Sequence, residues 1–404
     1  IASALLGYPT TGSLTLPITP AYRSRYFSFF FQDDWKITRK LTLNLGLRWD
    51  YESPIVERYN QQTIGFAFGQ PSPLANRVPG LTGGLLFAGN DGNNRFAFAP
   101  DRNNFQPRIG AAYSLNAKTV LRGGFGVYTL GQWALGGTNG FSRTTPVITT
   151  VDNLTPTASM SNPFPNGILR PIGASQGLST DLGLALNFGY RERPLPLSKQ
   201  VSFGIQRELP FGIFADLAYV GNFTGGLPIS GQLNSIPVTE LGRPASYYAE
   251  RIANPLAGLL PNNSALNGAT IPRQSLLVDF PQYSSLLVSN VPAGTNSYNS
   301  LQLSARKRFA KGLNLQVNYF SGKTLEQLVP LNPQDLRAAS ILSPVLERRL
   351  TIFDVAQKLS VLGTYELPFG RNQRFLNQLH PFANGRQEGI QPQRLDHAGE
   401  PGQA

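Results

Sequence analysis

One serine in the sequence stands in a pattern that is typical of a catalytic motif. Gly173-Ala174-Ser175-Gln176-Gly177 has the G-x-S-x-G spacing of a hydrolase nucleophile, which needs a strand, a sharp turn and a helix to expose the serine. Proline-rich sequence precedes the motif and no helical periodicity follows it. The base for such a serine would have to be His380 or His397, and both lie in an irregular C-terminal stretch. We therefore interpret Ser175 as a loop residue.

Two glycine-containing motifs are incomplete. Gly322-Lys323-Thr324 resembles the end of a phosphate-binding loop, but the earlier glycine of that motif would fall at position 317, which is occupied by Val317. The segment with Gly123, Gly124 and Gly126 lacks the third glycine of a dinucleotide fingerprint and lies inside a predicted strand. We expect Gly123, Gly124 and Gly126 to permit curvature and close packing of a sheet.

The acidic residues do not form a reaction centre either. Asp33 and Asp34 are neighbours on a predicted strand, so their side chains should point to opposite faces. The chain has no cysteine, which excludes thiolate metal sites and disulfide-stapled scaffolds. The sequence thus predicts no catalytic, cofactor-binding or metal-binding residue, no cofactor and no enzyme activity, and it does not identify ligand-binding residues.

The elements that carry these motifs are long strands arranged in four repeated hairpins. Each strand has about ten or more residues, whereas five or six are usual in globular proteins. The predicted pairs are Tyr26–Trp35 with Leu41–Tyr51, Phe105–Leu115 with Thr119–Leu130, Ser198–Glu208 with Ile213–Phe223, and Asn296–Phe309 with Leu313–Gly322, and a ninth strand is Ala356–Leu367. Within each pair the turn is short, but long spacers separate the pairs.

Apolar and polar residues alternate along these strands, most regularly in the fourth hairpin. The apolar set that we expect on one face is Leu301, Leu303, Leu313, Leu315, Val317 and Tyr319. The polar set expected on the other face is Gln302, Arg306, Asn314, Gln316 and Asn318. If lipid lies against the apolar face, Leu315→Arg should impair assembly while Gln316→Arg is tolerated.

Composition favours a membrane-spanning β-barrel over a soluble β-sandwich or propeller. Only 14% of the residues are charged, mean hydropathy is −0.16, and no run approaches the roughly 18 apolar residues of a spanning helix. Aromatic residues gather at strand ends, as in the interfacial girdles of barrels, for example Trp35 at a turn and Trp49 at the other end. The net charge of +12 is scattered rather than clustered, which argues against nucleic-acid binding.

These observations predict an all-β fold, a partial antiparallel transmembrane barrel of about nine to eleven strands in the outer membrane of a Gram-negative cell. Short turns should face the periplasm and long loops the exterior. Residues 1–25 are expected to be an irregular lead-in, 26–370 the partial barrel and 371–404 an irregular tail. Short pieces such as Thr63–Phe68 and Arg95–Ala99 are expected to extend the barrel wall above the membrane.

Several sequence blocks along the predicted barrel resemble one family, the Oar-like TonB-dependent receptors. The match runs over most of Tyr26 to Gly370 in the family's order. The blocks are Phe30-Phe31-Gln32-Asp33-Asp34-Trp35, Leu41-Thr42-Leu43-Asn44-Leu45-Gly46-Leu47-Arg48, Asn104-Phe105-Gln106-Pro107-Arg108-Ile109-Gly110, Leu121-Arg122-Gly123-Gly124-Phe125-Gly126, Ala218-Tyr219-Val220-Gly221-Asn222, Tyr298-Asn299-Ser300-Leu301-Gln302, and the Glu-Leu-Pro-Phe-Gly turn found at both Glu208 and Glu366.

The resemblance implies a transporter of about 22 strands whose lumen is filled by an N-terminal plug. Its implied partners are outer-membrane lipid, the plug, the TonB complex acting through a segment ahead of the plug, and an unidentified extracellular ligand. The sequence departs from the family by containing no plug, no carboxypeptidase-regulatory-like domain and only nine clear strands, so we expect further chain on both sides. Two other classes stay open: a non-transporting outer-membrane anchor or adhesin, and a soluble carbohydrate-binding β-domain.

Overall fold

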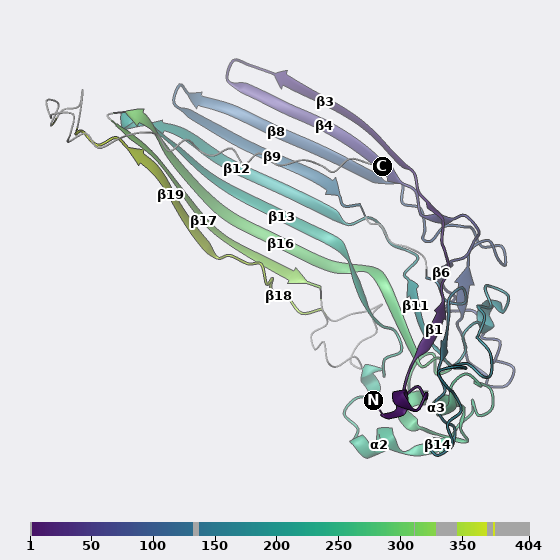
Figure 1. The fold of residues 1–404 in the computed structure, drawn as a ribbon. Coiled ribbons are helices and arrows are strands. Elements are labelled where there is room, and N and C mark those ends of the chain that lie inside the picture. The colour runs from purple at the N-terminus through teal and green to yellow at the C-terminus, as the bar shows by residue number, and fades with distance from the viewer. Residues whose placement is uncertain (1, 132–136, 311, 329–345, 370–374, 376–404) are drawn as a thin grey trace, which may run out of the picture.

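One large antiparallel sheet dominates the computed structural model, which describes residues 2–131, 137–310, 312–328, 346–369 and 375. Its nine long strands follow the chain in order from edge to edge (Figure 1). They are β3 (Tyr26–Lys36), β4 (Leu41–Glu52), β8 (Asn104–Asn116), β9 (Thr119–Thr129), β12 (Leu197–Leu209), β13 (Ile213–Gln232), β16 (Ser285–Ala310), β17 (Leu313–Gln327) and β19 (Gln357–Tyr365). The nine predicted strands are thus confirmed, each within a few residues at its turn end.

Two short strands complete the sheet within the described residues, for a total of eleven. Strand β18 (Arg349–Leu350) pairs with the end of β17, and β11 (Ala185–Gly189) runs parallel to the start of β16. The edges of the sheet are β3 and β19, which lie apart in Figure 1, so this part of the chain forms an open, twisted wall. The predicted partial barrel of nine to eleven strands is therefore confirmed.

All short turns lie at one end of the wall. The turn between β12 and β13 is the 3₁₀ turn η2 (Pro210–Gly212), in which Phe211 and Gly212 take φ angles of 63° and 70°. Small register shifts near Asn116 and after Lys307 accommodate two further turns. Short connections at one end and long ones at the other give the two ends of the wall different surroundings.

Strands β13 and β16 extend beyond the predicted limits of Phe223 and Asn296. Their pairing continues to Gln232 and Leu287 through three successive register shifts after Gly225. Bulges of this kind bend a strand and increase its twist. The pair therefore leaves the plane of the wall and enters the domain formed by the long loops (Figure 1).

The long loops fold together into a compact domain, which we call the loop domain, at the end of the wall opposite the turns (Figure 1). Its two-stranded sheets join β6 (Thr63–Phe66) to β7 (Leu85–Phe87), β1 (Ser13–Leu16) to β10 (Arg143–Pro146), β2 (Tyr22–Arg23) to β5 (Val56–Glu57), and β14 (Arg251–Ala253) to β15 (Thr270–Pro272). Its short helices are α1 (Ala2–Leu5), α2 (Ala245–Ala249), α3 (Ser264–Asn267), η1 (Gly177–Ser179), η3 (Val238–Glu240) and η4 (Arg273–Leu276).

Two short pieces were expected to extend the barrel wall, and this prediction was wrong. Thr63–Phe66 pairs with β7 in a separate sheet, and Arg95–Ala99 makes only an isolated bridge between Phe96 and Val56. The reason is apolar burial, because Phe66 is buried in the loop domain rather than aligned with the wall. β13 and β16 extend beyond the wall instead.

An apolar core holds the loop domain together. Phe66 lies at its centre, stacked on Phe188 at 5.0 Å between ring centroids and edge-on to Phe280 at 5.1 Å. Leu286 and Val288 of β16 are fully buried in the same core. Such a cluster joins segments more than 200 residues apart, so the loops have a defined structure of their own.

Two predicted boundaries, at residues 26 and 371, lie near the ends of the described chain. Residues 13–16 and 22–23 of the predicted lead-in form β1 and β2, which pair within the loop domain, and the boundary at residue 26 stays a proposal. The predicted tail 371–404, with His380 and His397, lies outside the described residues except for Phe375. None of the described helices has the length and apolarity to span a membrane.

Candidate functional site

The two faces of the wall are separated by residue parity. In the central register every cross-strand pair joins two even-numbered or two odd-numbered residues, for example Arg48 with Gln106, Gly204 with Ala218, and Gln302 with Phe320. Even-numbered residues of all nine long strands therefore share one face, which we call the even face. This face carries the polar set predicted for the fourth hairpin, and the opposite, odd face carries the leucines.

Near the loop domain the even face carries a hydrogen-bonded polar network. Asp50 accepts hydrogen bonds from Arg48 Nε at 2.8 Å and from Gln106 Nε2 at 2.5 Å, and Gln106 also donates to Thr129 Oγ1 at 3.0 Å. Arg48 donates in addition to the Tyr26 hydroxyl. Both Asp50 and Gln106 are buried. The Asp50 carboxylate is hydrogen-bonded to polar side chains and has no apolar core beside it. Such a carboxylate suits the polar lumen of a barrel.

Separate hydrogen-bonded pairs follow toward the turns, and most of their groups are amides and hydroxyls. Gln206 donates to Asp216 at 2.7 Å, and Ser304 donates to Asn318 at 2.8 Å. Hydroxyl and amide groups dominate here, and they can exchange these partners for water or for groups of another domain. The even face is thus wettable along its whole length.

Glycines form a hollow of about 390 Å³ in the even face. Gly46, Gly110, Gly124 and Gly126 come from three consecutive strands and have no side chain to fill it. The Arg108 guanidinium stands beside it, 4.6 Å from the centre of the Tyr128 ring. Segments of other molecules can approach the backbone closely only where side chains are this small.

Aromatic rings cover some of the wall glycines. A Cβ added to Gly126 would lie 2.9 Å from the Tyr128 ring, and one added to Gly322 would lie 2.5 Å from the Phe320 ring. In both cases the ring belongs to a residue two positions along the same strand, and it lies over the glycine. The expectation that the glycines of β9 serve close packing is confirmed at Gly126.

The odd face is largely apolar between the rows of Lys199 and Lys307, with Asp33 and Lys323 as charged exceptions. Lys199 pairs with Phe223, which pairs with Ser297 on β16, and Lys307 lies ten residues farther along that strand. Ten residues span about 33 Å, or about 25 Å across a bilayer at a typical strand tilt near 40°. That height equals the apolar band of outer-membrane barrels.

Aromatic side chains lie at both ends of the first strand pair, β3 and β4, as predicted. At the loop end Phe29 stacks on Trp49 at 6.0 Å and Phe27 on Tyr51 at 6.4 Å. At the turn end Trp35 is 55% exposed. Such rings are typical of the two interfaces between hydrocarbon and water.

None of the enzyme-like motifs becomes a site. Ser175 lies in an irregular loop, where its hydroxyl donates to the carbonyl oxygen of Ile172. Lys323 and Thr324 lie inside β17, and Gly124 lies inside β9, without the strand-to-helix turns that phosphate or dinucleotide sites need. Asp33 and Asp34 fall on opposite faces of β3, and Asn44 donates to Asp34.

The loop domain contains a second, polar hollow of about 920 Å³ that the sequence reading did not identify. The odd-numbered residues of β11 and the start of β16 form part of its wall, including Asn187 and Ser285. Arg143 and Asp181 line it and are joined by an ion pair of 2.8 Å. Asp181 takes the left-handed φ of 56°, a conformation that aspartate tolerates better than most residues.

Glu57 holds the segment at Ala21, which precedes the first wall strand, against the loop domain by hydrogen bonds. Its buried carboxylate accepts hydrogen bonds from the backbone N–H groups of Ala21, Tyr59 and Gln61 at 3.1, 2.7 and 2.8 Å. Burial acts to raise the pKa of Glu57, but these backbone hydrogen bonds outweigh it and hold the pKa below the ordinary 4.5. The carboxylate therefore stays charged and stabilises this joint.

A comparison with protein families decides the class of the protein. The family model described as an outer membrane beta barrel domain matches residues 1–394. The chain belongs to the outer membrane β-barrel domain family. The protein therefore resides in the outer membrane, with the odd face toward lipid and the even face toward the lumen. The alternative of a soluble carbohydrate-binding β-domain is wrong.

Solved structures similar to this outer-membrane barrel chain include receptors and a transporter. The alcaligin outer-membrane receptor FauA of Bordetella pertussis is 12% identical with a TM-score of 0.36, over 86% of this chain and 35% of that one. The ferripyoverdine receptor of Pseudomonas aeruginosa is 10% identical with a TM-score of 0.36, over 86% and 27%. The outer-membrane transporter YddB of Escherichia coli is 10% identical with a TM-score of 0.36, over 85% and 40%.

The chain thus spans between 27% and 40% of the length of these three structures. No curated protein matches the sequence.

Proposed function

We propose that this chain is the barrel wall of an Oar-like TonB-dependent receptor that takes up an extracellular ligand. The observation that carries the proposal is the combination of a polar, hydrogen-bonded lumen face with a folded loop domain at one end of the wall. A loop domain with its own core and a polar hollow offers a binding surface, and the even face offers a route inward. The resemblance of the wall sequence to Oar-like receptors supports the same function.

In this proposal the lumen is filled by a plug, and the TonB complex supplies the energy for uptake. The glycine hollow and the neutral hydrogen-bonding groups of the even face suit contact with a removable domain, because they form hydrogen bonds without fixed charge pairing. The protein makes no covalent change to its ligand and needs no cofactor. The ligand itself is unidentified.

Conductance of the whole protein in a planar lipid bilayer tests this function. A plugged receptor should conduct little in buffer, should open when urea on one side loosens the plug, and should close again after the urea is washed out, because unpaired strand edges in hydrocarbon are costly and keep the wall folded. Steady conductance without urea would indicate a passive pore. No conductance in urea would favour a non-transporting anchor or adhesin.

A further inference from the structure

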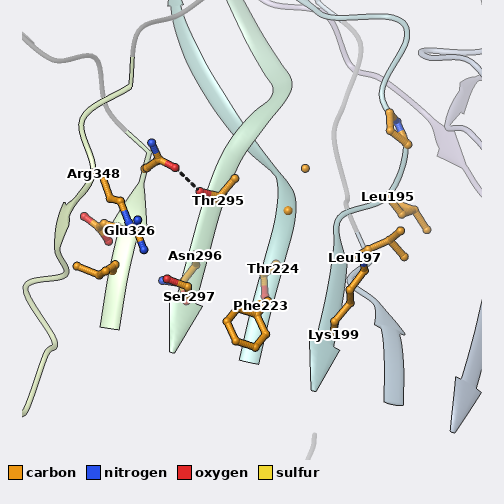
Figure 2. A pocket seen from close by; sticks show the side chains of 15 residues that line it. Leu195, Leu197, Lys199, Phe223, Thr224, Thr295, Asn296, Ser297, Glu326 and Arg348 are labelled. Atoms are coloured by element: carbon orange, nitrogen blue, oxygen red, sulfur yellow. Dashed lines mark hydrogen bonds between the residues drawn. The ribbon is translucent and has the colours of Figure 1, made fainter. Parts of the chain in front are cut away.

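Two hollows of the described chain combine several cationic side chains. The first is a groove of about 580 Å³ that crosses β12, β13, β16 and β17 (Figure 2). It is lined by Lys199 and Arg348, but also by the Glu326 carboxylate. An acidic group therefore already accompanies the cations of this groove.

The second hollow is lined by arginines without a carboxylate. It lies in the loop domain beside the pair of β2 and β5 and has a volume of about 520 Å³. Its lining residues are Ala21, Tyr22, Arg23, Val56, Arg58 and Arg95. None of these three arginines forms an ion pair with a described residue. A hollow lined by charges of one sign raises the local concentration of the opposite ion, so this one attracts anions.

The pairing of β2 with β5 explains why the nearest acidic residue does not neutralise these arginines. Arg23 pairs with Val56. The backbone N–H of Arg58 donates to the carbonyl oxygen of Ala21 at 2.9 Å, so both pairs share one face of the ladder. Glu57 lies between Val56 and Arg58 in the sequence, and its side chain therefore points to the opposite face. Both of its carboxylate oxygens accept backbone hydrogen bonds there, which leaves the arginines without a counterion.

Arg95 is held in position by three hydrogen bonds. Its Nε donates to Asn60 Oδ1, and its Nη2 donates to the carbonyl oxygens of Glu57 and Arg58 at 2.9 and 2.8 Å. Among the described residues none accepts a hydrogen bond from Nη1. The guanidinium is thus fixed with one nitrogen left over for a ligand. A side chain that is already ordered loses little conformational freedom when it binds.

We propose that this hollow binds the phosphate group of a water-soluble extracellular molecule between Arg23, Arg58 and Arg95. An esterified phosphate has three terminal oxygens and a charge of about −1.5 to −2 at neutral pH. A carboxylate has two oxygens and one negative charge, and a single bidentate arginine matches it. Three arginines around one hollow therefore suit phosphate better than carboxylate.

The position of the hollow favours a soluble molecule over a lipid. Phe27 and Tyr51 stack at the loop end of the first strand pair. Arg23 lies four residues beyond Phe27, which is about 13 Å along an extended chain. The apolar lining consists of the small side chains Ala21 and Val56, which are too few to hold an acyl chain. The inference goes beyond the proposed function, because phosphate can bind here whether or not the molecule is transported.

Calorimetric titration of the whole protein in detergent with inorganic phosphate tests the proposal. Each arginine should contribute about tenfold in affinity through charge-assisted hydrogen bonds, so R23A/R58A should weaken binding about 100-fold. R23K/R58K should retain part of the affinity, because lysine keeps the charge but loses the bidentate geometry. The matched control is R77A/R170A, which removes two exposed arginines that do not line the hollow and should bind like the wild-type protein.

Acetate and lipid A supply the remaining arms. Acetate should bind the wild-type protein more weakly than phosphate does. In phosphatidylcholine vesicles, the affinity for phosphate should be the same with and without lipid A. No binding of phosphate, unchanged binding by the folded R23A/R58A variant, an equal loss in R77A/R170A, or equal affinity for acetate would each overturn the proposal. Loss of phosphate binding in the vesicles with lipid A would overturn it too, because the arginines would then bind lipid phosphate. Folding of every variant is checked by its mobility on unheated gels.

Discussion

Single residues show most clearly why the wall has only one possible orientation. Gln302 and Leu303 are sequence neighbours, but one pairs with Phe320 and Ala218 on the even face and the other with Tyr319 and Leu217 on the odd face. Reversing the wall would bring Gln206, Asp216 and Asn318 into hydrocarbon. The cost of several uncompensated polar groups there exceeds any gain from burying the leucines.

The orientation predicts different outcomes for two neighbouring substitutions. Leu303 lies near the middle of the apolar band, where an arginine costs about 2–4 kcal/mol, so Leu303→Arg should lower the yield of folded protein in the outer membrane. Gln302→Arg is the control and should assemble normally, because its guanidinium stays in the lumen. The yield of the heat-modifiable folded band is the measurement, and a worse result for Gln302→Arg would reverse the two faces.

The register also refines the expectation for Leu315 and Gln316. Leu315 pairs with Lys307, at the margin of the apolar band. The penalty for a charge falls to about 0–1 kcal/mol near the interfaces. Leu315→Arg should therefore be milder than Leu303→Arg.

Glu57 gives the loop domain a predictable response to acid. Its folded pKa lies below the ordinary 4.5, so its stabilisation is complete above about pH 4.5 and is lost as the pH falls through the folded value. Glu57→Gln should destabilise this joint by about 2 kcal/mol at neutral pH, the value of hydrogen bonds to a charged group, and should remove the acid response. Hydrogen exchange of the Tyr59 and Gln61 amides, corrected for intrinsic rates, measures both effects. An acid response that persists in Glu57→Gln would assign it to another group.

For whole strands, the predictions were correct where a local sequence pattern determines the structure. Strands such as Leu41–Tyr51 alternate strictly, and alternation fixes both the strand and its faces. The continuation of β13 past Gly225 was missed because Gly226, Pro228 and the bulges interrupt that alternation. The parallel pairing of β11 with β16 was missed because it joins residues about 100 positions apart and leaves no local signal.

The loop domain was missed for the same reason. Phe66, Phe188, Phe280 and Leu286 lie in short apolar stretches of separate loops, and only the fold brings them together. The polar hollow with Arg143 and Asp181 depends on that fold, so its residues could not be selected beforehand. The even face, in contrast, was predicted because it repeats every second residue.

Destabilising the core of the loop domain should leave the wall folded. Phe66→Ala is expected to cost about 3–5 kcal/mol, because it removes a buried ring at the centre of the core. When whole cells that carry this variant are treated with trypsin, the loops should be cleaved. The gel band of the folded wall in unheated samples should persist. Tyr59→Ala, which alters an exposed ring of the same domain, should stay resistant. Loss of the folded wall in Phe66→Ala would show that the two parts fold as one unit.

For the whole molecule, the described sheet accounts for a wall and not for a closed barrel. Both β3 and β19 present an unpaired edge within the described residues. Unpaired backbone groups in hydrocarbon cost several kcal/mol each, so these edges must be paired in the membrane. We expect further strands of the same protein to pair with them, as the resemblance to larger plugged barrels implies.

The central claim is that lipid and water lie on opposite sides of one sheet, and a cysteine scan of β16 tests it most directly. The chain has no cysteine, so single substitutions from Tyr298 to Ala305 can each carry a spin label in the protein reconstituted in lipid vesicles. Labels at odd positions should be relaxed by oxygen, which concentrates in hydrocarbon, and labels at even positions by a water-soluble nickel chelate. The predicted result is a strict period of two with its oxygen maxima at residues 301 and 303. A reversed phase, or equal access of both reagents along the strand, would contradict the account.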